Sequence, residues 1–368
     1  MFPADWIDLL NEIEAASGAA DSEQALAPGL VHHLRRSGLL GATVPKEHGG
    51  FDWGASQIGR LHYELGRRCT STRAIVTAHQ LVVEVLCRWG TPSQNSRWQR
   101  RFADGTALAA FALSEEDAGA NPERICASAV ADGPGFRLSA KKRWITGARI
   151  ADAILVAACV DGQPTAFLVE LPNPCITIRP IHDLLGLRGA MVAEVEFRDV
   201  PVSPEAVVGP IGSGLLAMVG TGLDLGRFVT AWGATGIQAQ CYRIVREFMF
   251  RPDASGRRRI DHQLVRRLMA EMMVNLRSSE LLCKHAAELR DCRSPESVGA
   301  GMLAKYACAK AAAASTRNAV EALGALGCSS ATPVARFFRD AKVLEIIEGT
   351  NEVLEDVMGT FWHECCET

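Results

Sequence analysis

The sequence lacks the features that mark membrane-inserted and nucleic-acid-binding proteins. No apolar run approaches the ~20 residues that a membrane-spanning helix needs. The 39 basic and 42 acidic side chains leave a net charge of −3, without the basic excess that nucleic acid or an anionic membrane attracts. The start, Met1 to Trp6, shows no basic segment followed by an apolar one. We therefore expect a cytoplasmic protein that binds neither nucleic acid nor membrane.

Paired-cysteine motifs are also missing. The chain has 12 cysteines, but no two of them form a Cys-x-x-Cys pair. A zinc ribbon and a thioredoxin-like redox motif are therefore excluded, and we predict reduced thiols and no metal site.

Several catalytic and nucleotide-binding motifs are absent as well. Gly209-x-x-Gly212-x-Gly214 is the nearest match to a dinucleotide fingerprint, but its spacing is wrong and no strand-helix alternation surrounds it. Walker A, His-Glu-x-x-His and Gly-x-Ser-x-Gly sequences do not occur. A Rossmann enzyme, a zinc protease and an α/β-hydrolase therefore have no support.

The spacing of apolar residues changes twice along the 368 residues of the sequence. Residues 1–108 show helical spacing of apolar residues. Residues 109–205 break into short runs rich in Val, Ile, Phe and Thr, separated by turns such as Asp132–Gly135 and Asp161-Gly162. Residues 206–368 return to helical spacing. We predict an α+β protein with an N-terminal helical domain, a central antiparallel β domain and a C-terminal four-helix bundle.

Two helix starts are predicted in the last domain. Asp261 suits an N-cap, followed by an apolar stripe at Leu264, Leu268, Met272 and Leu276. Ser294-Pro295-Glu296 combines an N-cap with a proline and an early acid.

Four segments carry chemical information when taken together. They are Phe111–Asn121 (FALSEEDAGAN), Lys142–Gly147 (KRWITG), Gly186–Gly189 with Glu194–Val200, and Arg339–Lys342 (RDAK) five residues before Glu348–Glu352 (EGTNE).

At these segments the chain resembles the flavin-dependent acyl-CoA dehydrogenase family over nearly its whole length. It is most similar to acyl-carrier-protein dehydrogenases that help make hydroxymalonyl or methoxymalonyl extender units for polyketides. The resemblance implies FAD as cofactor and an acyl thioester, on a carrier protein or on coenzyme A, as substrate. It also implies a homodimer or homotetramer; the electron acceptor stays unknown.

Desaturation of an acyl thioester needs a base for the α-proton and an acceptor for the β-hydride. Glu348 lies where the family holds its base, although a lone Glu-Gly-Thr is also compatible with a helix cap. Some family members carry the base at the position of Gly226, which has no side chain to take a proton. The resemblance therefore implies Glu348 as the catalytic residue.

The resemblance also assigns cofactor and substrate residues. Ser114 and Thr146 match hydroxyls at the isoalloxazine edge, and Trp144 matches an indole beside the ring, although a core aromatic is an equal reading. Thr350 and Glu352 match contacts to the pyrophosphate and ribose region, and Arg251, Glu321 and Gly324 match contacts to a neighbouring subunit's FAD. The remaining cofactor residues are Phe111, Leu113, Gly119 and Gln263. The substrate residues are Ala120, Asp224, Arg227 and Gly349, with a salt bridge as an equal reading for Arg227.

Departures from the family pattern bear on the cofactor and on the carrier. Arg251 is followed by Pro252–Gly256 without the usual aromatic residue, which puts retention of FAD in doubt. Glu355 and Asp356 stand where the family usually has arginines. This argues against coenzyme A, with its phosphorylated nucleotide, as the carrier of the acyl group. Arg257–Arg259 with Arg266-Arg267 form a basic cluster that could meet an acidic carrier, although a solvated surface is the more ordinary reading.

Other functions stay open at this point. One is oxidation of ordinary fatty or branched acyl-CoA. Another is a flavin monooxygenase or oxidase on the same fold. The third is a non-catalytic assembly partner that has lost FAD.

Overall fold

The structure is a computed structural model that describes residues 2–119 and 121–365. It divides into two compact units that interleave along the sequence. The first unit comprises the residues through Gly54, Ala74–Leu184 and Arg188–Gly226. The second comprises Ala55–Arg73, Leu185–Leu187 and the chain from Arg227 onward.

Helices dominate the N-terminal part of the chain, as predicted. They are α1 (Ala4–Ser22), α2 (Pro28–Arg36), α3 (Ala55–Gly66), α4 (Thr70–Trp89) and α5 (Pro92–Ala103). Helix α5 begins with a capping box in which Thr91 and Gln94 exchange side-chain and backbone hydrogen bonds, with Pro92 in the first turn. The segment Thr91–Ser93 is therefore a helix start.

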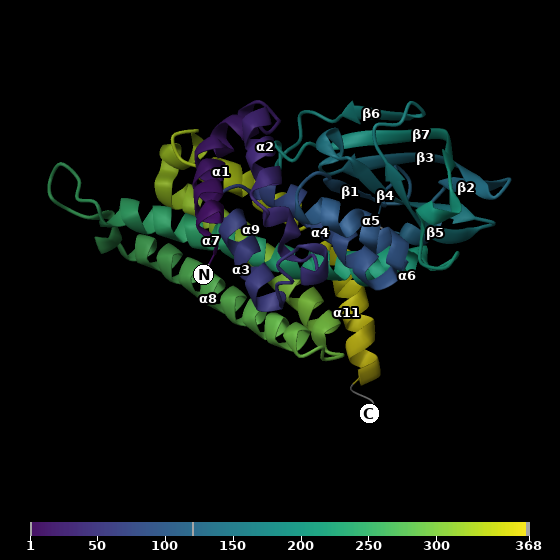
Figure 1. Cartoon of the computed structure of the whole chain (residues 1–368). Helices are drawn as coiled ribbons and strands as arrows, with labels where there is room; N and C mark the ends of the chain where they lie inside the picture. The colour runs from purple at the N-terminus through teal and green to yellow at the C-terminus, as the bar shows by residue number, and fades with distance from the viewer. Residues whose placement is uncertain (1, 120, 366–368) are drawn as a thin grey trace. The chain divides into compact units, whose positions relative to one another are not determined.

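The first unit also contains the sheet, seen at the upper right of Figure 1. Its strands follow the order β6-β7-β3-β2-β4-β5-β8, and β1 lies beside β4. The strands are β1 (Ala109–Ala112), β2 (Ser128–Asp132), β3 (Gly135–Ile145), β4 (Ala153–Val160), β5 (Gln163–Glu170), β6 (Ile176–Pro180), β7 (Ala193–Val202) and β8 (Val207–Val208). Most pairs are antiparallel, as predicted, whereas β1–β4 and the short β2–β4 contact are parallel. The nearly continuous apolar run of β4 is typical of a strand buried on both faces, but it does not identify which strands lie beside it.

Both faces of the central strand β4 are covered. Leu155 and its neighbours on one face join a core with side chains of α4 and α5, such as Leu86 and Phe102. Ile154 and Val156 on the other face pack with side chains of β3 and β7. The period-2 alternation of β4 therefore feeds two separate apolar clusters.

Long helices build the second unit. They are α7 (Asp224–Phe250), of which the residues from Arg227 belong to this unit, α8 (Gln263–Asp291), α9 (Ser297–Leu323), α10 (Val334–Leu344) and α11 (Asn351–Cys365). Helix α9 packs against α8, α10 and α11, and α8 runs alongside α7 in Figure 1. None of the helices in the described chain is long and apolar enough to cross a membrane.

Two helix-start predictions in this unit were wrong in detail. Asp261 ends a 3-10 turn and its carboxylate accepts a bond from Arg258 at 3.0 Å, so α8 starts at Gln263 without a side-chain cap. Helix α9 starts at Ser297, because Ser294 and Pro295 are still in the turn before it. Leu264 is 73% exposed, so the buried stripe of α8 begins later, with Met269, Met272 and Leu276.

Candidate active site

The loop between α10 and α11 carries Glu348 in a constrained conformation. Glu348 has φ of 58° and Gly349 has φ of 93°, so two consecutive residues occupy the left-handed region. Glycine adopts that region freely, whereas a glutamate there is strained. The loop is closed by Glu345, whose carbonyl accepts a bond from the Asn351 amide at 3.0 Å. This closure fixes where the Glu348 side chain points.

Two cations hold the backbone of this loop. Arg227 on α7 donates from Nε to the carbonyl of Glu348 at 3.2 Å. Lys305 on α9 donates from Nζ to the carbonyl of Gly349 at 2.6 Å and is fully buried. Arg227 therefore positions the predicted base through its backbone, a role that neither of the two sequence-based readings of this arginine included.

The Glu348 carboxyl group is shielded from water. Its Oε2 atom is inaccessible to solvent and has no hydrogen-bond partner in the described part of the chain. Burial raises the pKa of Glu348 above the ordinary 4.5, although the positive charges of Arg73, Arg227 and Lys305 act in the opposite direction. A carboxylate with a raised pKa and a free oxygen is suited to accept a proton from a bound molecule.

Arg73 and Lys305 were not predicted as site residues. Both are fully buried, and burial lowers the pKa of Arg73 to about 10 and that of Lys305 to about 8. A sequence signal did exist, because each is an isolated cation in a helix whose neighbours are otherwise small or buried. What the sequence could not provide was their proximity to Glu348.

Thr350 and Glu352 lie at the start of α11. The Thr350 Oγ1 accepts a bond from the Val353 amide at 3.3 Å, so Thr350 caps the helix. Glu352 is exposed, and hydrogen bonds to its own backbone and to Thr350 lower its pKa. A helix N-terminus of this kind favours phosphate groups, while an acid in the first turn opposes them. The predicted contact of both residues with FAD stays a prediction.

The first unit contains the residues predicted to lie beside the flavin ring. Trp144 sits at an irregularity in the β3–β7 pairing, with φ of 63°, and its side chain is 51% exposed. A bulge of this kind re-aims a side chain out of the sheet. Ser114 is held close by, because its carbonyl accepts a bond from the Arg143 amide at 3.0 Å. Thr146 is half-buried two residues after Trp144.

A buried ion pair anchors the loop that carries Ser114. Lys142 donates from Nζ to Glu115 at 2.7 Å and to the carbonyl of Leu113 at 3.1 Å. Glu115 also accepts bonds from the backbone amides of Cys126 at 2.6 Å and Ala127 at 3.1 Å. The loop after β1 is thus fastened to β3 and to the residues before β2.

Phe111 and Leu113 point into the apolar core that also contains Leu155. Their side chains are buried, so any contact of these two residues with a cofactor must involve the backbone or an edge of the ring. Gly119 is exposed. Ala120 lies outside the described residues.

The residues predicted to meet a neighbouring subunit's FAD lie at one end of the second unit. Helices α8 and α9 are antiparallel neighbours, since Asn318 near the end of α9 donates to Glu271 near the start of α8 at 3.0 Å. Glu321 and Gly324 follow Asn318 on that side. Arg251 directly follows the end of α7 and Gln263 starts α8, so they lie at the same end of the helices. All four residues predicted here are exposed.

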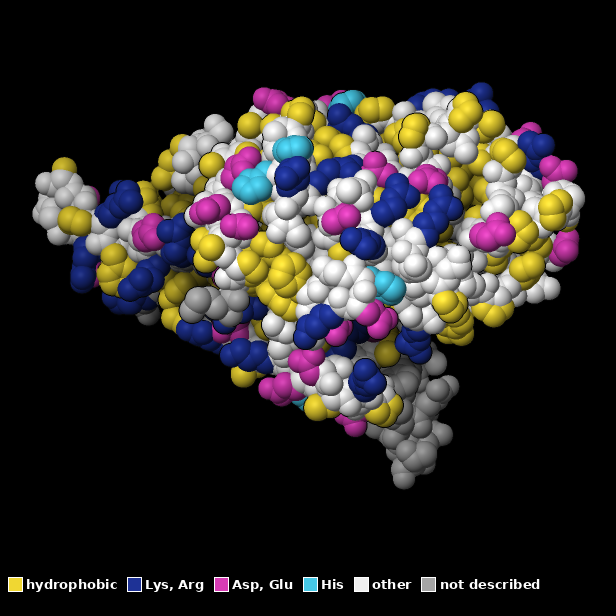
Figure 2. Space-filling view, in the orientation of Figure 1, with side chains coloured by type: hydrophobic (Ala, Val, Ile, Leu, Met, Phe, Trp, Pro, Cys, Tyr) yellow, Lys and Arg dark blue, Asp and Glu magenta, His cyan; other side chains and the backbone are white. Residues whose placement is uncertain are grey.

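The basic cluster beside them is largely bound to local partners. In Figure 2, Lys and Arg side chains gather over α8 and the loop that precedes it. Arg258 pairs with Asp261 at 3.0 Å, Arg259 lies 4.3 Å from the Phe248 ring and Arg267 lies 3.6 Å from Glu271. These contacts favour the reading of a solvated surface.

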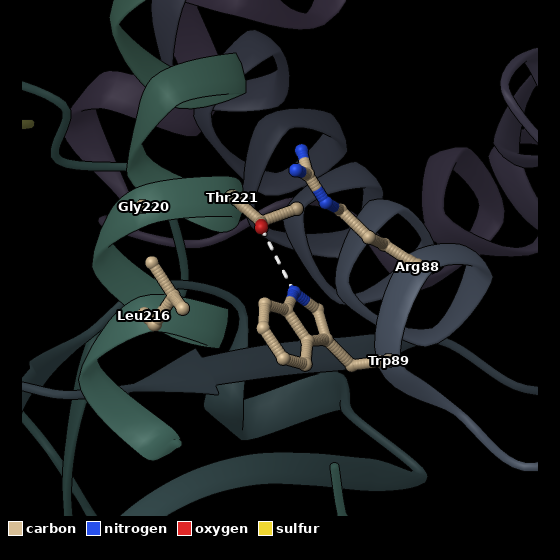
Figure 3. Close-up of a pocket in the computed structure, with 5 residues that line it drawn as sticks. All are labelled: Arg88, Trp89, Leu216, Gly220 and Thr221. Carbon is tan, nitrogen blue, oxygen red and sulfur yellow. Dashed lines mark hydrogen bonds between the residues drawn. The ribbon is translucent and has the colours of Figure 1, made fainter.

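The first unit has a separate hollow of about 200 Å³, which none of the predicted site residues lines. Its walls are Arg88, Trp89, Leu216, Gly220 and Thr221 (Figure 3). Trp89 donates from Nε1 to the Thr221 hydroxyl at 2.9 Å and so ties the end of α4 to the π-helical turn Met218–Leu223. Asp224, a predicted substrate residue, is buried directly after this turn.

Comparison with known families follows the same order of domains along the chain. Residues 9–106 match the N-terminal domain of acyl-CoA dehydrogenase, residues 110–200 the middle domain and residues 212–361 the C-terminal domain. The chain belongs to the acyl-CoA dehydrogenase family. Members are FAD-dependent oxidoreductases that act on CH–CH bonds, so the predicted family, enzyme class and cofactor are confirmed at this level.

Individual relatives cover nearly the whole chain. The mitochondrial short-chain specific acyl-CoA dehydrogenase of Bos taurus is 32% identical, over 93% of this chain and 84% of its own. The cyclohex-1-ene-1-carbonyl-CoA dehydrogenase of Geobacter metallireducens is 30% identical over 96% of each chain. Among solved structures, FkbI, described for biosynthesis of the methoxymalonyl extender unit of the polyketide Fk520, is 28% identical with a TM-score of 0.91, covering 98% of this chain and 99% of its own.

The residues present fit an isoalloxazine ring. Trp144 exposes half of its indole although it belongs to a strand, and a planar aromatic partner would cover it. The Ser114 hydroxyl lies on the loop that is bonded to the neighbouring Arg143. Hydroxyls and an indole are suitable neighbours for the heteroatoms and the face of a flavin.

Proposed function

We propose that this protein is an FAD-dependent acyl-thioester dehydrogenase in which Glu348 removes the α-proton. The observation that carries the proposal is the shielded, unpartnered Oε2 of Glu348 on a loop fixed by Arg227 and Lys305. FAD, when bound, accepts the β-hydrogen as hydride. Ser114, Trp144 and Thr146 would hold its ring.

The chain's own residues account for the proton transfer. Glu348 is ionised before the reaction and carries the α-proton on its carboxylate afterwards. Burial favours the protonated product form, while Arg73, Arg227 and Lys305 favour the ionised reactant form. The two effects oppose each other, so the readiness of Glu348 to take up and release a proton depends on both its burial and its cationic neighbours.

We further propose that the acyl group is carried on an acyl carrier protein and serves secondary metabolism. The likeness to FkbI over the full chain supports this substrate, as do the exposed acids Glu355 and Asp356 on α11. Coenzyme A ends in a phosphorylated nucleotide, which cations would bind better than acids do. The exposed end of the helices with Arg251, Gln263, Glu321 and Gly324 supports a homo-oligomer, which light scattering tests.

The experiment that tests this function is an anaerobic titration followed by the visible spectrum of the flavin. The purified protein is mixed with butyryl-CoA and, separately, with the butyryl thioester of an acyl carrier protein. Bleaching by the carrier thioester and not by butyryl-CoA is the expected result. Bleaching by both at equal rates would overturn the carrier proposal, and a flavin that no thioester bleaches would overturn the dehydrogenase.

A further inference from the structure

The indole that is predicted to meet the flavin ring has an arginine on one of its faces. The guanidinium carbon of Arg143 lies over the Trp144 ring, 4.8 Å from its centroid. A guanidinium at this distance is attracted by the π electrons of the ring. Trp144 is nevertheless 51% exposed. The indole therefore keeps surface for a second planar group.

An irregular backbone brings these two side chains together. In a regular strand consecutive side chains point to opposite faces of the sheet, so Arg143 and Trp144 would not meet. Here the β3–β7 pairing is irregular between Lys142 and Ile145, and Trp144 has φ of 63°. This left-handed residue turns the chain, and the guanidinium comes to lie on the indole.

Two carboxylates from separate segments hold the guanidinium in place. Arg143 donates from Nη1 to Glu116, in the loop after β1, at 2.8 Å. Its Nε lies 3.0 Å from Oε1 of Glu194, on β7, in an ion pair. A guanidinium carries donors in several directions within one plane, so it can meet two carboxylates while its face rests on a ring. The orientation of Arg143 is therefore fixed by β7, by the loop after β1 and by the indole.

The backbone on both sides of Trp144 is held as well. The Arg143 amide donates to the carbonyl of Ser114 at 3.0 Å, and the Gly147 amide donates to the carbonyl of Ala190 at 3.0 Å. A left-handed conformation in a bulky residue persists only where the surroundings impose it, and such strain is common at ligand-binding sites. Exposed ion pairs contribute little to stability, so stability of the fold alone does not account for this arrangement.

We infer that Arg143 is a positioning residue that holds the Trp144 indole in the orientation in which it binds the flavin ring. The inference rests on the proposed function, because that function supplies FAD as the partner of Trp144. An indole that is already oriented loses less conformational freedom when the cofactor binds. Glu116 and Glu194 balance the charge of Arg143, so its effect on FAD passes through the orientation of the indole.

The test measures how tightly and in what surroundings the holoprotein holds FAD, without any substrate. Dilution releases FAD, and the rise in flavin fluorescence gives its dissociation constant. Visible circular dichroism reports the surroundings of the bound ring. Arg143→Met is expected to raise the dissociation constant about fivefold and to change the dichroism, and Arg143→Lys to keep part of the wild-type behaviour. Unchanged values in Arg143→Met would overturn the inference. Tighter binding would also overturn it, because the guanidinium would then cover surface that the flavin needs.

Arg97 offers a matched control in the same protein. Its guanidinium carbon lies 5.3 Å from the ring of the neighbouring Trp98, and it also pairs with a carboxylate, that of Glu170. Arg97→Met should leave the dissociation constant and the dichroism unchanged. A loss of FAD equal to that in Arg143→Met would overturn the inference, because removal of any stacked arginine would then have the same effect.

A second variant covers the case in which Arg143→Met does not fold. Glu194→Gln keeps the shape of the side chain but removes one of the two charges that hold Arg143, and it should raise the dissociation constant about twofold. An unchanged dissociation constant and an unchanged dichroism in Glu194→Gln would count against the inference.

Trp144→Ala separates failure of the inference from failure of the proposed function. If the purified protein holds no FAD, or if Trp144→Ala leaves FAD binding and dichroism unchanged, the proposed contact between Trp144 and the cofactor fails and the inference fails with it. If Trp144→Ala changes both readouts and Arg143→Met changes neither, only the inference fails. In the Trp144→Ala background Arg143→Met should have no further effect, since its partner is gone. A further effect of the same size would show that Arg143 acts without the indole and would overturn the inference.

Discussion

The Lys305 Nζ donates to the carbonyl of Gly349 at 2.6 Å. This bond joins α9 to the residue directly after Glu348, so the position of the proposed base depends on a buried ammonium group. Arg227 makes the corresponding contact one residue earlier. The loop is strained at Glu348, whose φ is 58°, and its conformation is therefore imposed by these partners rather than by local preference.

Lys305 gives a stability prediction with a definite sign. Burial lowers its pKa from 10.5 to about 8, so the unfolded chain keeps this proton at pH values where the folded chain has released it. The cost of burying the charge is complete below pH 8 and disappears as the pH rises to 10.5. We expect the free energy of unfolding of the wild type, relative to Lys305→Met, to increase by about 3 kcal/mol between pH 7 and 10.5.

Urea denaturation of both proteins at each pH measures this difference. Taking the difference cancels the titration of groups that the two proteins share. A difference that stays constant, or falls, as the pH rises would contradict the lowered pKa of Lys305.

Glu348→Gln should separate binding from chemistry. The amide has nearly the same shape as the carboxylate but cannot take up the α-proton, so flavin reduction should slow by about 10² to 10⁴-fold. FAD content and thioester affinity should stay within about threefold of the wild type. Stopped-flow absorbance under anaerobic conditions measures the rate. Near-normal reduction by the variant would remove Glu348 from the reaction.

The pH profile of the same reaction reports on the environment of Glu348. Its pKa is raised above 4.5, and the ionised form is the active one, so the reduction rate should rise with pH through a value above 4.5. Removing a nearby cation raises the pKa further. The acid limb should therefore move to higher pH in Lys305→Met. A shift to lower pH would show that Lys305 does not act on Glu348 as described.

Trp144→Ala tests the predicted contact between Trp144 and the flavin ring. The indole is half exposed, so its loss should change the free energy of unfolding by less than about 1 kcal/mol. FAD retention should nevertheless fall, because the ring would lose a stacking partner. The ratio of flavin to protein after gel filtration gives the answer. Val130→Ala, an exposed apolar residue on β2, is the matched control and should retain the cofactor.

The Lys142–Glu115 pair should behave as a buried ion pair. Lys142→Met leaves the Glu115 carboxylate buried without its cation and should cost about 3 kcal/mol. Adding Glu115→Gln should recover part of this loss, since the amide is neutral and its oxygen still accepts a backbone bond. Arg243→Met, which breaks an exposed pair on α7, should cost less than about 0.5 kcal/mol in the same denaturation experiment. Equal losses of stability in Lys142→Met and Arg243→Met would contradict a special role for the buried pair.

Much of the fold could be predicted because turn residues and apolar spacing along the sequence indicate where strands and helices begin and end. The turns at Asp132–Gly135 and Asp161-Gly162 do join β2 to β3 and β4 to β5. Predictions failed where the local preference of a residue differed from its surroundings in the folded chain. Asp261 is an excellent N-cap type, yet it pairs with Arg258 instead, and Leu264 fits the apolar period but lies on the exposed part of α8. The ion pair with Arg258 thus outweighed the preference of Asp261 for capping a helix.

The candidate site was only partly readable for a different reason. Glu348 could be proposed because it lies in a short motif, with Arg339–Lys342 a few residues before it, that resembles the motif where the family holds its base. Arg73 could not, because nothing in the sequence near position 73 indicates which distant residues it approaches. The same holds for Lys305, because its small neighbours in the sequence do not indicate that its side chain reaches the carbonyl of Gly349.

The sequence by itself determined the order of helical and β segments, since this order depends on residue type and short-range spacing, and its motifs carry the resemblance that identified the family and implies Glu348 as the base. Tertiary structure alone decided that residues 55–73 join the C-terminal helices, that β1 and β4 pair in parallel, and that Glu348 is surrounded by Arg73, Arg227 and Lys305. Burial, and with it every shifted pKa, arises from contacts between segments far apart in the chain. The spacing of residues over a short stretch of sequence cannot predict such contacts.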